Sequence, residues 1–294
     1  MKQIAVISGK GGTGKTSITA AFIQSAKSVM AADCDVDAAN LHLLIEPISG
    51  RTAPKAFMSG YDAIVDKSRC ISCGKCIPVC VFEAIARDET DNKVKTNHLL
   101  CEGCGACVTI CRANAIRLVE KQAGESFLSN TRFGPMMHAK LYAGEGSSGK
   151  LVSEIKKQAC DIARSENSNF IILDGPPGTG CPVIATLTGA NRAVVVIEPS
   201  VSGVHDAKRA IELCKHFKVP VCIIINKYDI NLKMTENIEK FAMENKISVI
   251  GKIAFDKIFI EAMKKRMTVI EYDKNSAAAK SLIDAWDNLK KSMA

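Results

Sequence analysis

The chain has no long hydrophobic run and few aromatic side chains. Its 294 residues are 47% hydrophobic but only 5% aromatic, with a single Trp. The longest apolar runs, such as Ala193–Ile197 and Val221–Ile225, have the length of strands and are too short to span a bilayer. The stretch Ile4–Ile7 reads as a strand, and the residues around it lack the order of a signal peptide. We therefore expect a cytoplasmic protein with an ordinary buried core.

A concentrated basic surface is also missing from the sequence. The 39 Lys and Arg residues exceed the 31 Asp and Glu residues, which gives a formal net charge of +8. These basic residues are scattered and form no stripe interleaved with aromatic residues. The pattern therefore argues against a nucleic-acid partner.

The C-terminal segment Ser276–Ala294 has the spacing of an amphipathic helix. Its apolar positions are Leu282, Ile283, Trp286, Leu289 and Met293. Such a helix can lie on a membrane surface, although terminal helices of this kind more often close the sheet of their own domain. We expect the second role and no membrane partner.

Cysteine, in contrast, is abundant, with 13 residues. Eight of them form two runs with the same C-x2-C-x2-C-x3-C spacing, Cys70, Cys73, Cys76 and Cys80, then Cys101, Cys104, Cys107 and Cys111. Clustered cysteines in a reducing compartment bind metal more often than they form disulfides. The spacing is that of bacterial ferredoxins, in which the fourth cysteine of each run serves the other cluster.

This pattern predicts two 4Fe–4S clusters. The first would be bound by Cys70, Cys73, Cys76 and Cys111, and the second by Cys80, Cys101, Cys104 and Cys107. A zinc ribbon is the alternative, but it would leave four of the eight cysteines unused. Val81 and Arg112 stand where ferredoxins often have proline, a departure that removes no ligand.

The other five cysteines do not share this spacing. Cys34, Cys160, Cys214 and Cys222 lie in apolar or helical patterns, which is typical of core residues. Cys181 follows a glycine-rich turn at an expected helix start, where a thiol pKa can fall. Its role stays open between packing and a ligand or redox function.

A phosphate-binding loop follows the first strand. The loop Gly9–Thr16 reads Gly-Lys-Gly-Gly-Thr-Gly-Lys-Thr, in which Lys15 would contact the terminal phosphates and Thr16 would bind Mg²⁺. The residues expected to surround ATP are Gly11, Gly12, Thr13, Gly14, Lys15, Thr16 and Ser17. A plain glycine turn between a strand and a helix is the alternative, and eight matched positions argue against it.

The additional lysine in this loop, Lys10, resembles the deviant loop of the MinD/ParA superfamily, which includes the nitrogenase iron protein. The resemblance implies that Lys10 reaches the nucleotide of a dimer partner. It also implies that Asp35 orients the attacking water, with Lys10 and Lys15 as further catalytic residues. Asp33 and Asp174 would join Thr16 at Mg²⁺. These carboxylates could instead be helix caps.

One further position follows from the same resemblance: Asn226, which ends the strand Val221–Ile225, would read the adenine edge. Strands without apolar–polar alternation, such as Phe170–Leu173 and Ser248–Ile253, are typical of parallel sheets covered on both faces. The expected fold is therefore α/β, a doubly wound and mostly parallel P-loop sheet. A small α+β domain like a bacterial ferredoxin would be inserted at residues 61–120, between ATPase segments 1–60 and 121–294.

Three functions agree with these features. The first couples ATP-driven change in a homodimer, or a heterodimer with a similar ATPase, to electron transfer between an unknown redox donor and acceptor. The second is ATP-dependent delivery of a metal or Fe–S cluster to another protein. The third is spatial positioning, as in MinD itself. Sequence alone identifies no donor or acceptor.

Overall fold

The computed structural model describes residues 1–50 and 52–293, and the chain divides into two compact units. The larger unit comprises Met1–Lys55, Ser126–Leu141 and Ser148–Ala294. The other, called the cysteine unit here, comprises Ala56–Glu125 and Tyr142–Ser147. The sequence placed the insert at 61–120. The cysteine unit begins at Ala56, and its first segment ends at Glu125. It also includes the separate segment Tyr142–Ser147.

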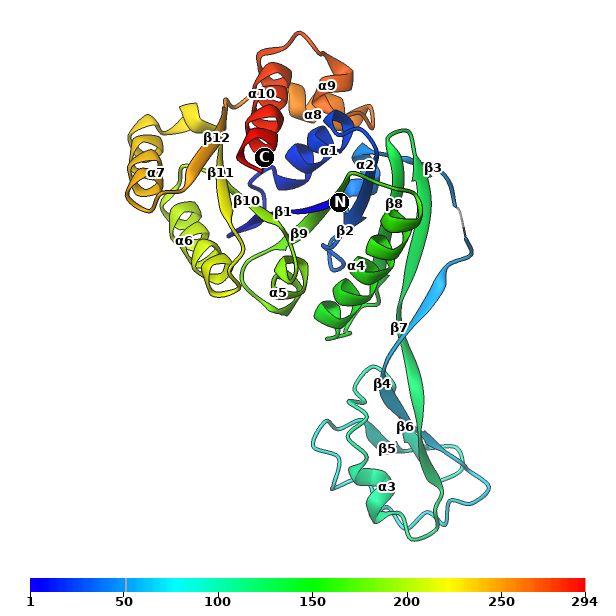
Figure 1. The fold of residues 1–294 in the computed structure, drawn as a ribbon. Helices are drawn as coiled ribbons and strands as arrows, with labels where there is room; N and C mark the ends of the chain where they lie inside the picture. The colour runs from blue at the N-terminus through cyan, green and yellow to red at the C-terminus, as the bar shows by residue number, and fades with distance from the viewer. Residues whose placement is uncertain (51, 294) are drawn as a thin grey trace. The chain divides into compact units, whose positions relative to one another are not determined.

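The larger unit is built on a predominantly parallel sheet with the strand order β12-β11-β10-β1-β9-β2-β8-β7-β3 (Figure 1). Its strands are β1 (Lys2–Ser8), β2 (Val29–Asp33), β3 (Pro47–Gly50), β7 (Ile116–Thr131), β8 (Gly134–Leu141), β9 (Phe170–Pro177), β10 (Arg192–Ile197), β11 (Val221–Asn226) and β12 (Ser248–Ile253). β1 lies between β9 and β10 and is parallel to both, and β3 pairs with β7 in the antiparallel sense. The α/β, mostly parallel sheet expected from the sequence is confirmed.

Helices cover both faces of this sheet (Figure 1). α1 (Lys15–Ser25) lies on one face with α8 (Ile258–Lys264), α9 (Val269–Tyr272) and α10 (Ala277–Ser292). The other face carries α4 (Ser148–Ser165), α5 (Cys181–Leu187), α6 (Val201–His216) and α7 (Leu232–Glu244). The short elements are α2 (Leu41–Leu44) and the 3-10 turn η1 (Tyr228–Ile230). Because both faces are covered, the central strands contain apolar runs without alternation, and Ile4–Ile7 are fully buried.

The apolar face of the C-terminal helix α10 packs into the core of its own unit. Leu282, Trp286 and Leu289 are almost inaccessible to solvent. The Trp286 ring lies 5.4 Å from the ring of Phe22 on α1 and 5.3 Å from that of Phe170 on β9. The expectation that this helix closes its own sheet is confirmed for its described residues. Ala294, the last residue of the expected segment, lies outside them.

The cysteine unit has its own small core and its own secondary structure. β4 (Lys55–Val65) pairs with β7, β5 (Ile85–Arg87) pairs with β6 (Val94–Thr96), and α3 (Ala106–Ile110) begins within the second cysteine run. The polar turn expected at Asp88–Lys93 joins β5 to β6. Cysteine side chains pack with Ala63, Val94 and Ile116 in the interior of this unit.

Candidate functional site

The phosphate-binding loop lies between β1 and α1, at the carboxyl end of the sheet. Gly12 and Gly14 both have positive φ angles, 79° and 86°, and Gly14 caps the first turn of α1. A Cβ atom at Gly14 would also lie 2.3 Å from Asn226 Nδ2. Glycine is therefore required at this position by backbone conformation and by space.

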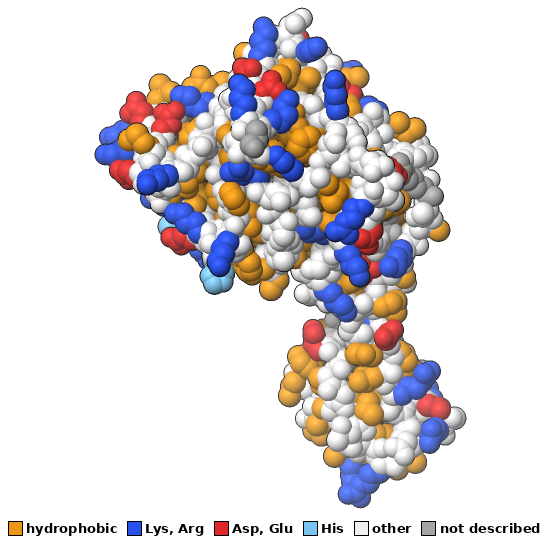
Figure 2. All heavy atoms as spheres, in the orientation of Figure 1, with side chains coloured by type: hydrophobic (Ala, Val, Ile, Leu, Met, Phe, Trp, Pro, Cys, Tyr) orange, Lys and Arg blue, Asp and Glu red, His pale blue; other side chains and the backbone are white. Residues whose placement is uncertain are grey.

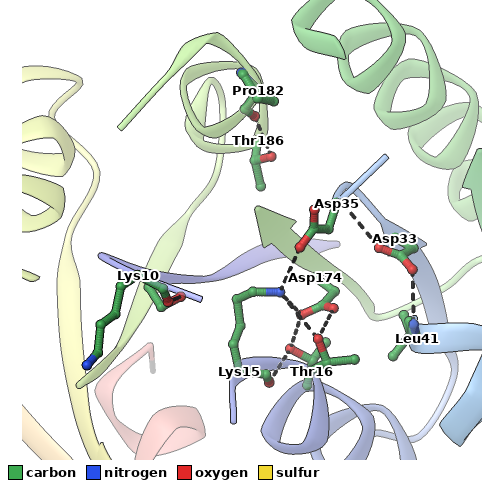
Figure 3. Close-up of polar contacts among 11 residues, drawn as sticks. Lys10, Lys15, Thr16, Asp33, Asp35, Leu41, Asp174, Pro182 and Thr186 are labelled. Atoms are coloured by element: carbon green, nitrogen blue, oxygen red, sulfur yellow. Dashed lines mark hydrogen bonds and ion pairs between the residues drawn. The ribbon is translucent and has the colours of Figure 1, made fainter. Parts of the chain in front are cut away.

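Lys15 and Asp174 form a buried ion pair at the centre of the site (Figure 3). Lys15 Nζ lies 2.9 Å from Asp174 Oδ1. The hydroxyl of Thr16 donates to Asp174 Oδ2 at 2.8 Å, and that of Thr19 donates to Oδ1 at 2.8 Å. Burial opposes the charged form of Lys15, but Asp174 outweighs it, so the pKa of Lys15 is raised. The sequence reasoning missed Thr19, which its position one helical turn after Lys15 could have revealed.

Asp33 and Asp35 leave the end of β2 in different directions (Figure 3). Asp35 Oδ2 lies 4.0 Å from Lys15 Nζ, so Asp35 faces the loop. Asp33 is fully buried and accepts hydrogen bonds from the backbone N–H groups of Asp35 and Leu41. Burial, with a contribution from Asp174, raises the pKa of Asp33 to about 8. Asp174 and Asp35 thus lie within 4.0 Å of Lys15 Nζ, whereas Asp33 is turned toward the backbone behind them.

A cleft of about 700 Å³ opens over this group. Its walls include the loop from Gly11 to Ser17, Asp35 and Pro176. The buried side-chain atoms Thr13 Oγ1 and Asn226 Oδ1 have no hydrogen-bond partner within the described part of the chain. The amide of Asn226 donates to Thr13 O at 2.7 Å, so only its oxygen is left without a partner. Asn226 is only 4% exposed, so this oxygen is a buried acceptor, a kind of atom that usually has a hydrogen-bond partner.

Lys10 points away from the group around Asp174 (Figure 3). Its Nζ donates to Ser200 Oγ at 3.0 Å and to Ser202 Oγ at 3.4 Å, and lies 3.7 Å from Glu198 Oε1. Glu198 belongs to no motif recognised in the sequence, and its position became visible only through the fold.

The eight paired-run cysteines line two separate small cavities in the cysteine unit. One is lined by Cys80, Cys101, Cys104 and Cys107. The other is lined by Cys70, Cys73, Cys76 and Cys111. Each cavity therefore takes three cysteines from one run and the fourth from the other.

No group of three or more His, Cys, Asp or Glu residues within 1–50 and 52–293 has the geometry to hold a single metal ion. A 4Fe–4S cluster is bound differently, because each thiolate ligates its own iron and the four sulfurs need not meet at one point. The donor sets, four cysteines around each cavity, fit such a cluster chemically.

Backbone N–H groups approach three of these sulfurs. Ala63 N lies 3.4 Å from Cys101 Sγ, and Ala84 N lies 3.3 Å from Cys80 Sγ. Ala115 N lies 3.3 Å from Cys111 Sγ. Hydrogen bonds of this kind tune the potential of iron–sulfur centres.

The remaining cysteines differ in exposure. Cys34, Cys214 and Cys222 are buried, and burial raises the pKa of Cys34 and Cys214 to about 12, which favours the thiol over the thiolate. Cys160 is half-buried. Cys181 is exposed at the start of α5, close to Gly149.

The sequence matches the description "CobQ/CobB/MinD/ParA nucleotide binding domain" over residues 4–269. This chain belongs to that family. The match covers the loop, both acidic strand ends and Asn226, so the nucleotide-binding character of the cleft follows from family as well as from geometry.

Two relatives are similar to this chain over different shares of its length. An uncharacterised protein of Methanocaldococcus jannaschii is 34% identical over 291 residues, which cover 98% of this chain and 96% of the relative. An iron-sulfur cluster carrier protein of Pyrococcus horikoshii is 25% identical over 155 residues, about half of each protein (48% and 52%).

Among solved structures, the septum site-determining protein MinD of P. horikoshii, complexed with Mg-ADP, superimposes with a TM-score of 0.60. The sequence identity is 17%, with 100% of this chain and 98% of that chain covered. This likeness establishes the MinD-like P-loop fold for the chain.

The helices and the surface charges bear on possible membrane and nucleic-acid partners. No helix within the described residues is long and apolar enough to cross a membrane. Figure 2 shows Lys and Arg side chains at several separate places on the face that it draws. The scattered distribution seen in the sequence thus persists on that face.

Proposed function

We propose that this protein is a dimerising ATPase that couples ATP turnover to electron transfer through two 4Fe–4S clusters. The observation that carries the proposal is the division of eight cysteines into two sets of four, each around its own cavity, in a chain that also has a cleft walled by the glycine-rich loop. A chain that only hydrolyses ATP has no need of two such sets.

The nucleotide chemistry follows from the contacts around Lys15. Lys15 would exchange Asp174 for the terminal phosphates, and Thr16 and Asp174 would hold Mg²⁺, with Asp33 behind them. A Mg²⁺ ion held there would supply positive charge against the phosphate oxygens. Asp35, which is half-buried and faces the loop, would orient the water that attacks this phosphoryl group. Asn226 would accept a hydrogen bond from the adenine amino group.

Dimerisation is proposed through Lys10. Its ammonium group is held by neutral hydroxyls and one carboxylate on the surface of the larger unit, a group of contacts that a phosphate could replace. Two chains would then each supply Lys10 to the nucleotide of the other. ATP binding would favour the dimer, and hydrolysis would release it.

In the cysteine unit, the two thiolate sets would hold clusters that accept and donate single electrons. A conformational bias of about 3 kcal/mol between nucleotide states would shift a one-electron potential by about 130 mV, enough to redirect electron flow. Cluster delivery is the second candidate, because half of this chain is similar to iron-sulfur cluster carrier proteins. A resident ferredoxin-like module favours retention of the clusters and therefore the first function.

The test is anaerobic purification followed by iron analysis and a redox titration with and without ATP. We expect iron and sulfide in the purified chain, and a cluster potential or electron-delivery rate that changes with ATP. Incubation with an apo-acceptor distinguishes the candidates, since net iron transfer supports delivery and electron transfer without iron loss supports the reductase. An iron-free or zinc-containing protein would refute both.

A further inference from the structure

Glu198 bridges two lysines that belong to the phosphate-binding region. Its Oε1 lies 3.7 Å from Lys10 Nζ, and its Oε2 lies 2.9 Å from Lys227 Nζ. Lys227 Nζ also donates to Gly12 O at 3.2 Å. One carboxylate is thus connected directly to the loop residue Lys10 and, through Lys227, to the loop backbone.

Strand order explains why these residues meet. Lys10 follows β1, Glu198 follows β10 and Lys227 follows β11, and these three parallel strands are consecutive in the sheet. Their carboxyl ends therefore lie along one edge, where loops from distant parts of the sequence converge. Sequence spacing could not have connected Lys10 with Glu198.

The contacts of Lys10 are unequal in charge. Ser200 and Ser202 are neutral acceptors, and Ser200 Oγ also caps α6 by accepting from Gly203 N at 3.1 Å. Within the described part of the chain, Glu198 is the one carboxylate within 4 Å of Lys10 Nζ. Both side chains are half-buried, with 29% and 22% of their surfaces exposed. Glu198 therefore provides the negative charge that pairs with the ammonium group of Lys10 in this structure.

We propose that Glu198 is a positioning residue that retains Lys10 within its own chain and thereby sets the ATP concentration at which the dimer forms. The inference rests on the proposed function, in which Lys10 must leave this position to contact the partner's nucleotide. Glu198 and the phosphates compete for the same ammonium group. Each chain loses one Lys10–Glu198 contact on dimerisation, so the contact opposes the dimer twice.

The size of the effect follows from the exposure of the pair. Partly exposed ion pairs of this kind change an equilibrium constant by about two- to fivefold. Because two such contacts are released, Glu198→Gln should tighten the ATP-dependent dimer by about four- to 25-fold in its dissociation constant. Gln has the same shape as Glu and can still accept a hydrogen bond, so the substitution removes mainly the charge.

The experiment is sedimentation velocity of the full chain across a range of ATP and protein concentrations, in wild type, Glu198→Gln, Lys10→Ala and the double variant. Glu239→Gln is the matched control, because it removes one negative charge and breaks a similar exposed ion pair, that with Lys252, elsewhere on the surface. We expect Glu198→Gln to dimerise at lower ATP or protein concentration than wild type and control. The double variant should behave like Lys10→Ala and stay monomeric.

The outcomes distinguish the role of Glu198 from the proposed dimerisation through Lys10. If Glu198→Gln matches wild type while Lys10→Ala fails to dimerise, the role of Glu198 is wrong and the dimer proposal stands. If Lys10→Ala dimerises normally, the proposed function itself loses its dimerisation step. Should Glu198→Gln fold poorly, Glu198→Asp tests the same retention, because the shorter side chain draws the carboxylate away from Lys10; a dimerisation curve unchanged from wild type would overturn it.

Discussion

Lys15 Nζ and Asp174 Oδ1 lie 2.9 Å apart, although 159 positions separate the two residues in the sequence. Both side chains are almost completely buried, with 7% and 1% of their surfaces exposed. The pair joins the helix that follows β1 to β9, the parallel neighbour of β1. In the proposed nucleotide complex, phosphates would take Lys15 and Mg²⁺ would take Asp174, so that binding would replace a formed ion pair.

This competition predicts an unusual response of ATP binding to Asp174→Asn. Without Mg²⁺, the variant should bind ATP at least as tightly as wild type, because Lys15 no longer has to leave its nearest carboxylate, that of Asp174. With Mg²⁺, it should lose the metal-dependent gain in affinity, by about tenfold or more. Titration with a fluorescent ATP analogue, with Mg²⁺ or with EDTA, measures both effects. A variant that keeps the full wild-type response to Mg²⁺ would contradict the assignment of Asp174.

Paired substitutions test how the cysteines are shared between clusters. Cys80→Ser and Cys101→Ser, alone or combined, should each lower the iron content by about half, because both residues line one cavity. Cys80→Ser combined with Cys70→Ser should remove nearly all of it, although these two residues belong to the same run. Iron and sulfide analysis after anaerobic purification gives the answer, with Cys160→Ser as the control. Equal losses from both pairs would disprove the sharing.

The two clusters should differ in reduction potential. Among the described residues, Cys80 Sγ and Cys101 Sγ of one set each accept a hydrogen bond from the backbone N–H of another residue, at 3.3 and 3.4 Å, and in the other set Cys111 Sγ accepts one at 3.3 Å. Donors to sulfur stabilise the more negative, reduced cluster, so the first set should have the higher potential. A redox titration followed by electron paramagnetic resonance, with the Cys→Ser variants to assign the signals, tests the order. The reverse order would show that solvent exposure outweighs these contacts.

His138 should make the larger unit less stable in mild acid. Burial and the nearby His42 lower the pKa of His138 to about 4, below its ordinary value of 6.5. The unfolded chain then binds the extra proton first, so stability is complete above about pH 6.5 and falls as the pH drops toward 4. Between pH 7 and 5 the loss should be about 2 kcal/mol.

Urea unfolding at these two pH values measures that loss. His138→Gln should remove this part of the pH dependence, whereas replacement of the exposed His205 by Gln should leave it unchanged. An equal pH dependence in wild type and His138→Gln would exclude His138 as its source.

Lys156 should be a structural rather than a catalytic lysine. It is buried on α4, and its ammonium group donates to three carbonyl groups at the end of α5, those of Ala185, Thr186 and Thr188. Burial lowers the pKa of Lys156. Lys156→Met should destabilise the protein by about 2 kcal/mol, because the carbonyl groups lose their donor. Thermal unfolding beside the exposed Lys157→Met checks this, and equal stability of the two variants would contradict it.

The sequence by itself determined the features that depend on neighbouring residues. The glycines of the loop from Gly9 to Thr16, the apolar strands and the cysteine spacing each act within one strand, turn or short run. Their physics is local, since φ angles, side-chain periodicity and the reach of a thiolate are set by nearby residues. The loop, the parallel sheet and the packing of the C-terminal helix were therefore predicted correctly.

Only the tertiary structure decided which distant groups meet. The pairing of Lys15 with Asp174, the contact of Thr19 with the same carboxylate and the contact of Lys10 with Glu198 depend on the order of β1, β9 and β10 in the sheet. That order results from the packing of helices on both faces. It cannot be read from spacing along the chain, because residues far apart in sequence become neighbours only where the carboxyl ends of parallel strands share one edge.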